Sequence, residues 1–370
     1  YRLGVLGFLA PPWLSAEAPE DPKGNYGTLD QLAALKWVKR NIAAFGGDPD
    51  QITIAGQSAG AMSVQNLMTS PMAERLIDGA IIESSITAAF AEKEDRSHPL
   101  EKAEKVGVLF FEKAGIRSLE EARKLPGEEL VRLEDAILGQ GIHFEPAIDG
   151  ILIRESNFEA YKKNHHHRIP VLAGYNRGEA ESFAKAFTRP VETMAAFREY
   201  AAGFSDKAEE FMSLCGVKND AEVKALFSGN AMLDLAAGLR MFGYIHDSQD
   251  RKAYLYEFNA DIPGEDHAGS YHGSEMWFAY DSLARCWRPF TGRHYDLARQ
   301  VSSYWANFVK TGDPNGKDTI GEELPEWKSF TAENEFVMEF TDKPEESKVK
   351  ADALMKFRIG YTLGREIHES

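Results

Sequence analysis

Short apolar runs alternate with amphipathic segments along this chain of 370 residues. Residues 25–41 carry Leu32, Leu35 and Val38 three to four positions apart, which is the spacing of one apolar helix face. Two glycines and a proline within 45–50 end this helix. The later apolar runs are short and bounded by turn residues, as buried strands are. We predict strands over 52–56, 79–83, 168–174, 253–258 and 335–340, and further helices over 59–68 and 296–312.

This alternation of strands and helices predicts the fold class. Short continuous strands separated by helices are typical of an α/β protein with a mostly parallel sheet that helices cover on both faces. The charged stretch 92–135 has helical periodicity, residues 190–250 are also mostly helical in pattern, and both are expected to be helical insertions around the sheet. We find no internal repeat and no long linker, so we expect a single domain over residues 1–370. The first nine residues are expected to be the end of a strand.

Composition and charge narrow the range of functions. Hydrophobic residues make up 43% of the chain and charged residues 27%, which is ordinary for a globular protein and excludes a disordered chain. The net charge of −16 repels phosphate backbones, so the sequence argues against a nucleic-acid partner. No apolar stretch reaches the roughly 18 residues that a membrane-spanning helix needs. Cys215 and Cys286 allow one disulfide, but the fold does not require it.

The strongest chemical signal is a serine between a predicted strand and a predicted helix. Residues 56–60 read Gly-Gln-Ser-Ala-Gly, a G-x-S-x-G pattern in the context that a nucleophile elbow requires. The turn is so tight that we expect glycine to be needed at both Gly56 and Gly60. Ser58 then presents its hydroxyl at the carboxyl edge of the sheet, over a helix N-terminus. The backbone N–H of Ala59 is the expected donor to an oxyanion.

The segment around this serine resembles a known family. GNYGTLDQLAALKWVKRNIAAFGGDPDQITIAGQSAGAMSV at 24–64 is similar to the type-B carboxylesterases, the α/β hydrolases that include bacterial p-nitrobenzyl esterases and cholinesterases. YRLGVLGFLA at 1–10 matches the preceding family segment, and weaker matches follow at 144–150, 272–278 and 304–316. The resemblance implies an α/β hydrolase fold and hydrolysis of carboxylic esters by a Ser-Glu-His triad without a cofactor.

The resemblance also implies which carboxylate belongs to the triad. In VLAGYNRGEAESF at 171–183, Glu179 takes the acid position of the family pattern N-K/R-x-E. A carboxylate just past the carboxyl end of a strand is also where an α/β fold needs this acid. The segment departs from the family at Gly178, where Asp is common, and at Ala180, where Gly is common. Glu181 is a second carboxylate nearby.

The expected base is His272. It lies in GSYHGSEMWF, follows a late strand by a loop and has Gly and Ser neighbours, as the base of an α/β hydrolase does. It also matches the base position of the family, whereas His267 is a rival five residues earlier in a more polar stretch. In this interpretation His272 takes the proton of Ser58, and Glu179 orients the imidazole and stabilises its cationic form.

Two further residues are candidates for the substrate pocket. Gln57 stands where many relatives have Glu, so it is expected to hold His272 cationic less strongly and to disfavour a cationic, choline-like substrate. Trp277 follows the histidine motif and is either part of the pocket or part of the core. The expected partner is a small or medium carboxylic ester. The alternatives are an aryl or feruloyl esterase or a lactonase on the same triad, and a non-catalytic, cholinesterase-like binding module.

The remaining expectations concern donors and ligands. The family's Gly-rich oxyanion loop has no counterpart in this sequence, so further oxyanion donors are expected outside it, on a separate or absent N-terminal fragment. His165, His166 and His167 form a run before a predicted strand, and imidazole is a common metal ligand. Three consecutive residues do not point one way, and no spaced Cys or carboxylate set supports them, so we assign no metal.

Overall fold

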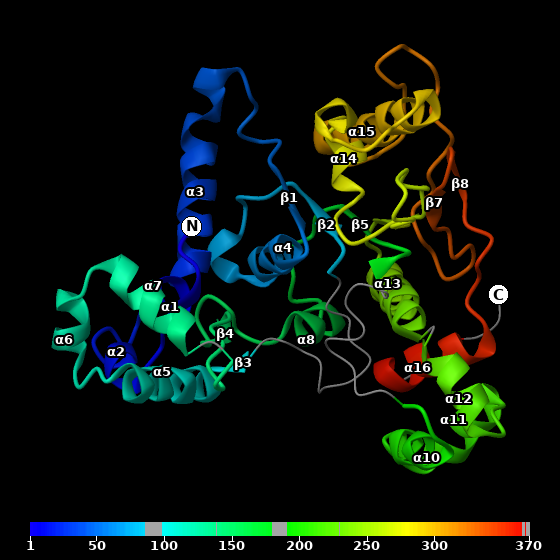
Figure 1. The fold of residues 1–370 in the computed structure, drawn as a ribbon. Coiled ribbons are helices and arrows are strands. Elements are labelled where there is room, and N and C mark those ends of the chain that lie inside the picture. The colour runs from blue at the N-terminus through cyan, green and yellow to red at the C-terminus, as the bar shows by residue number, and fades with distance from the viewer. Residues whose placement is uncertain (86–97, 138, 180–190, 229, 365–366, 368–370) are drawn as a thin grey trace. The chain divides into compact units, whose positions relative to one another are not determined.

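The computed structural model describes residues 1–85, 98–137, 139–179, 191–228, 230–364 and 367 (Figure 1). The chain divides into two compact units. The first comprises residues 1–52, 65–77 and 93–167, and the second comprises residues 53–64, 78–92 and 168–370. Each unit buries a hydrophobic core of its own.

The second unit contains a six-stranded sheet with the strand order β1-β2-β5-β6-β7-β8. Neighbouring strands from β1 to β7 are parallel, and β8 pairs with β7 in the antiparallel direction. The sheet is therefore mostly parallel, as the alternation of short apolar runs and helices predicted. Its strands are β1 (Thr53–Gln57), β2 (Gly79–Glu83), β5 (Val171–Asn176), β6 (Ala253–Phe258), β7 (Met338–Phe340) and β8 (Pro344–Glu346).

The register aligns the carboxyl ends of the central strands. Gln57 of β1 lies opposite Glu83 of β2, and Glu83 lies opposite Gly174 of β5. Asn176 and Phe258, the last residues of β5 and β6, also pair. Because parallel strands end at one edge of a sheet, the loops that follow these four strands start side by side, where α/β proteins place their sites.

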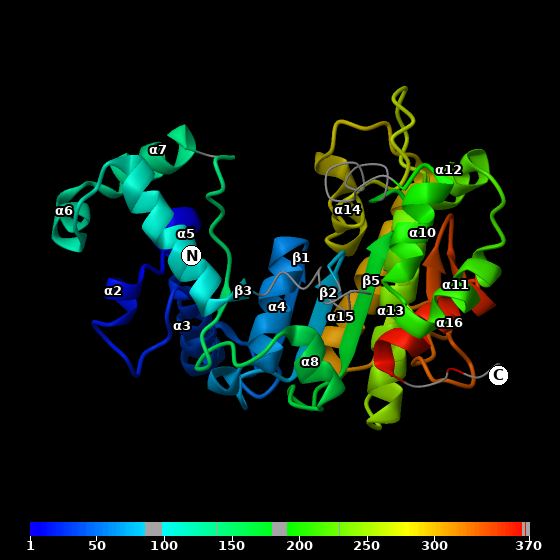
Figure 2. The same cartoon turned by 90° about the horizontal axis from the view of Figure 1, so that it is seen from below.

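Helices cover both faces of this sheet. On β6, Tyr254 and Tyr256 belong to the large core cluster that also contains the apolar side of α15 (Gly292–Thr311). Leu255 points to the opposite face, where α13 (Asn230–Ser248) packs against β6. Figure 2 shows α13 in front of the central strands and α15 behind them. Alternate residues of each central strand therefore enter different cores, which explains why these strands are apolar throughout.

A smaller aromatic cluster holds the other helices of the second unit together. Phe204 stacks on Phe211 with ring centroids 4.2 Å apart, and Phe357 packs against both rings. The helices that contribute to this cluster are α10 (Met194–Ala202), α11 (Ala208–Cys215), α12 (Asp220–Ser228) and α16 (Ala353–Leu363), and η3 (Ser205–Lys207) follows Phe204. Two short helices follow β6, namely α14 (Met276–Ala279) and η4 (Leu283–Arg285).

The first unit is built mainly from helices. Its core cluster contains Val5, Phe110 and Phe111, and Trp13 packs edge-on against Phe111. Helix α4 (Ala59–Thr69) begins in the second unit and ends in the first. The other elements of the first unit are α1 (Gly4–Phe8), α2 (Pro12–Ser15), α3 (Tyr26–Asn41), η1 (Ile42–Phe45), η2 (Pro71–Ala73), β3 (His98–Pro99), α5 (Leu100–Ala114), α6 (Leu119–Lys124), α7 (Gly127–Ala136), β4 (Ala147–Ile148) and α8 (Asn157–Lys162).

Most of the elements expected from the sequence are present. Strands β2 and β6 have the predicted bounds, and β1, β5 and β7 differ from prediction by one to three residues at their ends. The two charged stretches form α5 to α7 and α10 to α13 where they are described. That these stretches are insertions into one domain of 370 residues stays a prediction. Within the described ranges, no helix is both long and apolar enough to cross a membrane.

The prediction for the first nine residues is wrong. They were expected to end a strand, but residues Gly4–Phe8 form helix α1. The backbone N–H of Val5 donates to the carboxylate of Glu134 at 2.9 Å, and Arg2 is fixed by a two-pronged ion pair with Asp30. Glycine weakens a strand, and this segment carries Gly4 and Gly7. The backbone N–H groups of Arg2, Val5 and Gly7 thus bond to Asp30, Glu134 and the carbonyl of Leu3 rather than to a partner strand.

Candidate active site

Ser58 occupies the turn between β1 and α4. It has a φ of +56°, in the left-handed region that non-glycine residues rarely adopt. Its N–H donates to the carbonyl of Glu83 on β2 at 2.9 Å, and its own carbonyl accepts from Met62 in α4 at 3.1 Å. The strained residue is thus held by the sheet on one side and by the helix on the other. These contacts are those of a nucleophile elbow.

The two glycines of the motif differ in what they do. A Cβ at Gly56 would lie 2.3 Å from the backbone carbonyl carbon of Gly60, so no larger residue fits at position 56 without moving the turn. Beyond its chain neighbours and its own helix, a Cβ at Gly60 would meet no described atom within 4 Å. The expectation that both positions exclude side chains is therefore correct for Gly56 and wrong for Gly60. Gly60 contributes its backbone, which fills the space next to Gly56.

Glu179 lies three residues beyond the end of β5 and is buried, with 5% of its surface exposed. One carboxylate oxygen, Oε1, accepts a hydrogen bond of 2.6 Å from the backbone N–H of Asn176. The preceding residue, Gly178, donates its N–H to the carbonyl of Ser270 at 3.0 Å. This bond joins the loop that carries Glu179 to the loop that carries the expected base. Ala180 and Glu181 lie outside the described residues.

His272 connects the acid to the serine turn. Its Nδ1 lies 3.6 Å from Oε2 of Glu179, and its Nε2 lies 3.3 Å from Nε2 of Gln57, the residue before Ser58. The first distance is slightly longer than a hydrogen bond and is that of an ion pair when the imidazole is protonated. The neighbouring Glu179 carboxylate raises the pKa of His272, and burial of the ring opposes this effect. The fold thus brings Gln57, Glu179 and His272 together, next to Ser58.

The contact with Gln57 bears on the protonation of the imidazole. The Gln57 amide nitrogen is a donor, so it bonds to His272 Nε2 only while that nitrogen carries no proton. The ring proton is then on Nδ1, facing Glu179, which is the tautomer that a general base needs. Among the described residues, the hydroxyl of Ser58 has no hydrogen-bond partner. An amide adds no charge here, so the Gln57 side chain does not itself hold His272 in the cationic form.

The other candidates occupy different surroundings. His267, the rival base, is exposed with a φ of +46°. Ala59 is exposed and is the first residue of α4, and the first N–H groups of a helix have no acceptor within the helix. Trp277 is half-buried against the large core cluster of the second unit, so its role in a pocket stays a prediction.

Two buried carboxylates near the site were not singled out from the sequence. Glu83, the last residue of β2, is 3% exposed and accepts a hydrogen bond of 2.8 Å from the indole N–H of Trp305. Glu275 is 1% exposed and accepts hydrogen bonds from Ser84 Oγ, at 3.1 Å, and from the side-chain amide of Asn176. Burial, with the nearby Glu275 charge adding to it, raises the pKa of Glu83 to about 8. Burial also raises the pKa of Glu275.

A sequence signal for these residues existed. Glu83 is the one charge at the carboxyl end of an otherwise apolar run, and Glu275 lies in the histidine motif, three positions after His272. A charged residue within a fully buried strand needs a partner, so it marks a position of interest. The partners themselves, Trp305 and Asn176, are distant in sequence and are identified only by the fold.

The histidine run does not form one site. His165 Nδ1 contacts Glu155 at 2.6 Å, His166 packs edge-on against the ring of Tyr161, and His167 Nε2 contacts the carbonyl of Ser70 at 2.9 Å. Each imidazole thus has its own surroundings. Among the residues that the structure describes, no group of three or more His, Cys, Asp or Glu side chains is arranged to hold a metal ion. Both cysteines are free thiols.

Comparison with known proteins identifies the family of the chain. A model of the carboxylesterase family, the type-B group, matches residues 1–357. The chain belongs to this family. Among solved structures, a carboxylesterase of Geobacillus stearothermophilus aligns with a TM-score of 0.69 and 28% identity, covering 94% of this chain and 71% of that one. The observed sheet and its flanking helices are those of the α/β hydrolase fold, as the sequence predicted.

Curated relatives in this carboxylesterase family are named as esterases. The fumonisin B1 esterase of Sphingopyxis macrogoltabida is 30% identical over 335 residues, which cover 85% of this chain and 59% of the relative. The para-nitrobenzyl esterase of Bacillus subtilis (strain 168) is 31% identical over 333 residues, with coverages of 85% and 64%. The chain thus spans about three fifths of the length of these relatives.

Proposed function

We propose that the protein is a serine carboxylesterase in which Ser58 is the nucleophile, His272 the general base and Glu179 the residue that orients the base. The observation that carries this proposal is the position of His272, with Nδ1 facing the Glu179 carboxylate and Nε2 facing the residue that precedes Ser58. The strained turn at Ser58 and membership of the carboxylesterase family support the same assignment.

The first half of the reaction acylates the serine. As Ser58 Oγ bonds to the ester carbonyl carbon, His272 Nε2 takes the hydroxyl proton and the imidazole becomes cationic beside Glu179. The tetrahedral intermediate then collapses, the bond from carbon to the alcohol oxygen breaks, and His272 gives its proton to the departing alcohol. This leaves an ester between Ser58 and the acyl group. General acid–base help of this kind is worth roughly 10²–10⁴ in rate.

The second half regenerates the serine. A water molecule bonds to the acyl carbon while His272 takes its proton, and the returning proton goes to Ser58 Oγ as the acyl bond breaks. The products are a carboxylic acid and the free enzyme. In both halves the Ala59 N–H is the proposed donor to the oxyanion, and a single donor of this kind contributes about 10²–10³ in rate.

The proposed substrates are small to medium carboxylic esters. The names of the relatives, a para-nitrobenzyl esterase and a fumonisin B1 esterase, set the range to test. A panel of p-nitrophenyl esters of increasing acyl length, with one aryl ester and one lactone, distinguishes a general carboxylesterase from an aryl esterase and from a lactonase. The uncharged Gln57 side chain favours neutral alcohol groups over a cationic one, because a cation gains from a nearby carboxylate and an amide carries no charge.

The decisive experiment is covalent labelling with a fluorophosphonate. We expect the probe to label Ser58, and Ser58→Ala to abolish labelling and lower kcat by at least about 10⁴-fold. The matched control is Ser63→Ala, which changes a serine within α4 whose hydroxyl donates to the backbone carbonyl of Ala59 at 3.1 Å. Retained ester hydrolysis in Ser58→Ala, or absence of both labelling and hydrolysis in the unmodified chain, would overturn the proposal.

A further inference from the structure

The loop that carries His272 is long. Residues 259–275 join β6 to α14 without a regular element of their own. A loop of this length has many alternative paths, so fixed points must define the position of a residue within it. At its start, the N–H of Asn259 donates to the carbonyl of Phe340 at 2.8 Å. Near its end, Gly178 and Asn176 hold Ser270 and Tyr271.

Ile262 is buried in the large core cluster, Arg293 and His294 bond to Asp261, and one further side chain holds the residues that follow. Arg288 Nη1 donates to the carbonyl of Pro263 at 3.0 Å and to Asp266 Oδ1 at 2.9 Å, and Nη2 donates to Asp266 Oδ2 at 2.8 Å. Among the described residues, the hydrogen bonds that reach 262–268 from outside this loop all come from Arg288. The paired bonds to one carboxylate use the planar fork of the guanidinium, which makes them geometrically specific as well as strong.

The same guanidinium lies against the residue before the proposed base. Its central carbon lies 5.3 Å from the centre of the Tyr271 ring and 4.7 Å from the centre of the Trp287 ring, so the cation stacks on both aromatic faces. The Arg288 side chain is only 7% exposed, although it belongs to a connecting segment between η4 and α15. A Cβ at Gly264 would approach Arg288 Nη1 to 2.6 Å, so the loop backbone packs directly on the cation.

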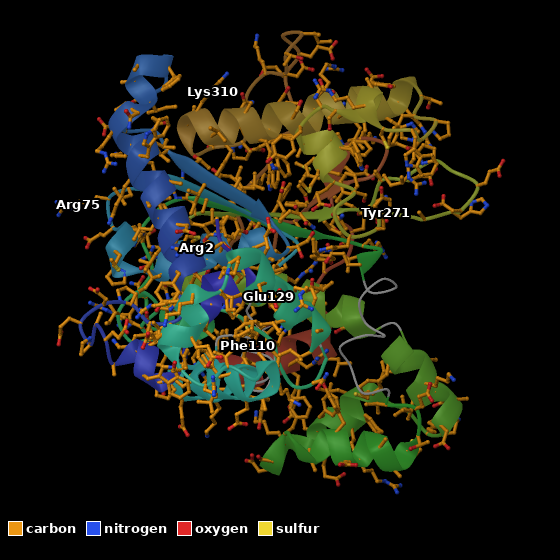
Figure 3. All side chains as sticks on the ribbon, turned by 60° about the vertical axis from the view of Figure 1, so that its left-hand side comes forward. Arg2, Arg75, Phe110, Glu129, Tyr271 and Lys310 are labelled. Atoms are coloured by element: carbon orange, nitrogen blue, oxygen red, sulfur yellow. The ribbon has the colours of Figure 1, made fainter. Side chains whose placement is uncertain are left out.

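Tyr271 links this cation to the proposed triad. Its carbonyl accepts a hydrogen bond of 2.8 Å from the side-chain amide of Asn176, whose backbone N–H bonds to Glu179. Figure 3 shows Tyr271 in the loop near the end of β5. A shift of the Tyr271 ring and carbonyl would therefore move His272, the next residue, and disturb the anchor of Glu179.

We propose that Arg288 is a positioning residue for the ester hydrolysis proposed above. It holds the loop of residues 259–275 through Pro263, Asp266 and Tyr271. His272 is thereby placed to meet Glu179 and Ser58. This inference rests on the proposed function. Arg288 takes no part in bond making, since its guanidinium is engaged with the loop. A misplacement of about 1 Å in a catalytic group can cost 10²-fold in rate, so a loop anchor of this kind has a measurable effect on kcat.

The test compares Arg288→Ala with Arg288→Lys and with Arg285→Ala. The lysine variant keeps the charge but loses the fork, and Arg285 is an exposed arginine three residues away on η4. With a p-nitrophenyl ester, we expect kcat to fall about 10- to 100-fold in both Arg288 variants, with KM changed little. Arg285→Ala should keep the kcat of the unmodified chain. The rate of fluorophosphonate labelling should fall in parallel with kcat.

Two further readouts separate positioning from general destabilisation. Millimolar guanidinium chloride, far below denaturing concentrations, should restore part of the activity of Arg288→Ala and none in Arg288→Lys, where the lysine fills the site. The acid limb of the kcat profile should also move to lower pH in Arg288→Ala, because a displaced His272 loses the carboxylate that raises its pKa. The groups that set this limb are Glu179, Glu275 and the neutral Gln57.

The outcomes are distinguishable. If both Arg288 variants keep the kcat and the acid limb of the unmodified chain, the positioning role is wrong while the proposed function stands. If Arg288→Ala fails to fold, the kcat and the acid limb of Arg288→Lys decide whether Arg288 has the positioning role. If the unmodified chain neither hydrolyses esters nor reacts with the probe at Ser58, the proposed function itself fails.

Discussion

The carboxyl ends of β5 and β2 each hold a buried glutamate close to the proposed nucleophile, in surroundings of opposite character. Glu179, beyond β5, accepts a backbone N–H bond and faces the imidazole of His272. Glu83, at the end of β2, accepts one indole N–H bond and lies near a second buried carboxylate, Glu275. The first setting places the carboxylate beside the imidazole, whereas burial in the second, with the nearby Glu275 charge adding to it, raises the pKa of Glu83 to about 8.

The comparison shows that position in the fold does not determine what a carboxyl group does. The carboxyl groups of Glu83 and Glu179 are both buried, so the difference between them comes from the groups that surround them. Burial next to a like charge favours the neutral form of Glu83, whereas Glu179 faces an imidazole that becomes cationic only in the proposed reaction. Pairs of titratable groups with such different surroundings are common in active sites. We expect Glu83 to act as a neutral hydrogen-bonding group near pH 7 and Glu179 to orient the imidazole of His272.

The largest expected effect comes from removing the charge at Glu179. Glu179→Gln keeps the shape of the side chain but loses the negative charge that orients His272 and stabilises its cation, so kcat should fall about 10³–10⁴-fold. The matched variant Glu83→Gln should change kcat at pH 7 by no more than a few-fold, since a neutral group replaces a neutral one. Steady-state kinetics with a p-nitrophenyl ester measure both. Equal losses in the two variants would refute the contrast.

The next effect concerns the pH dependence of stability. The pKa of Glu83 is about 8 in the folded protein and near 4.5 in an unfolded chain, so between these values the folded state binds more protons. The Glu83 contribution therefore destabilises the fold progressively as pH rises from about 4.5 to 8, and it is constant above that range. In Glu83→Gln this contribution is absent.

Urea unfolding at pH 5 and pH 8 measures this difference. The stability of Glu83→Gln relative to the unmodified chain should increase by roughly 2–4 kcal/mol between the two pH values. The raised pKa of His272 also makes stability fall with pH, since its pairing with Glu179 helps the fold fully below pH 6.5 and is lost as pH rises through the folded value. This effect of His272 is the same in Glu83→Gln and in the unmodified chain, so it cancels in the comparison. If the difference in stability between Glu83→Gln and the unmodified chain is the same at pH 5 and pH 8, Glu83 is ionised over this whole range.

The smallest effect concerns the donor to Glu83. Trp305→Phe keeps an aromatic ring in the core beside Tyr256 and Phe340 and removes the indole N–H, so the fold should lose about 1–3 kcal/mol. Above pH 8, where Glu83 is ionised, the loss should be smaller in the background of Glu83→Gln, since an amide oxygen is a weaker acceptor than a carboxylate oxygen. A double-mutant cycle from unfolding curves measures this coupling. Additive losses would show that the indole N–H does nothing for Glu83.

Much of the fold and of the proposed site follows from local pattern. Short apolar runs specify the strands because both faces of the sheet are covered, and the G-x-S-x-G turn specifies Ser58 because Gly56 has no room for a side chain. The motif around His272 distinguishes it from His267, and the structure brings His272 rather than His267 to the carboxylate. These features depend on neighbours in sequence.

The features that escaped prediction depend on neighbours in space. The helix at Gly4–Phe8 is fixed by Glu134 and Asp30, which lie far along the chain. Burial and the nearby Glu275 charge raise the pKa of Glu83, Trp305 donates to it, and no periodicity indicates such contacts. The hydrogen bonds from Arg288 to Pro263 and Asp266 likewise join two separate connecting segments.

The backbone of Ser58 has a consequence for how the protein withstands heat. A non-glycine residue held at a φ of +56° costs the folded state on the order of 1–3 kcal/mol, and glycine adopts this conformation without that cost. Replacing the serine by glycine should therefore raise the melting temperature while removing the hydroxyl. A population of variants selected only for survival at high temperature would accumulate inactive chains at this position. At Ser58, the residue on which the proposed chemistry depends, a higher melting temperature is therefore obtained only at the expense of catalytic activity.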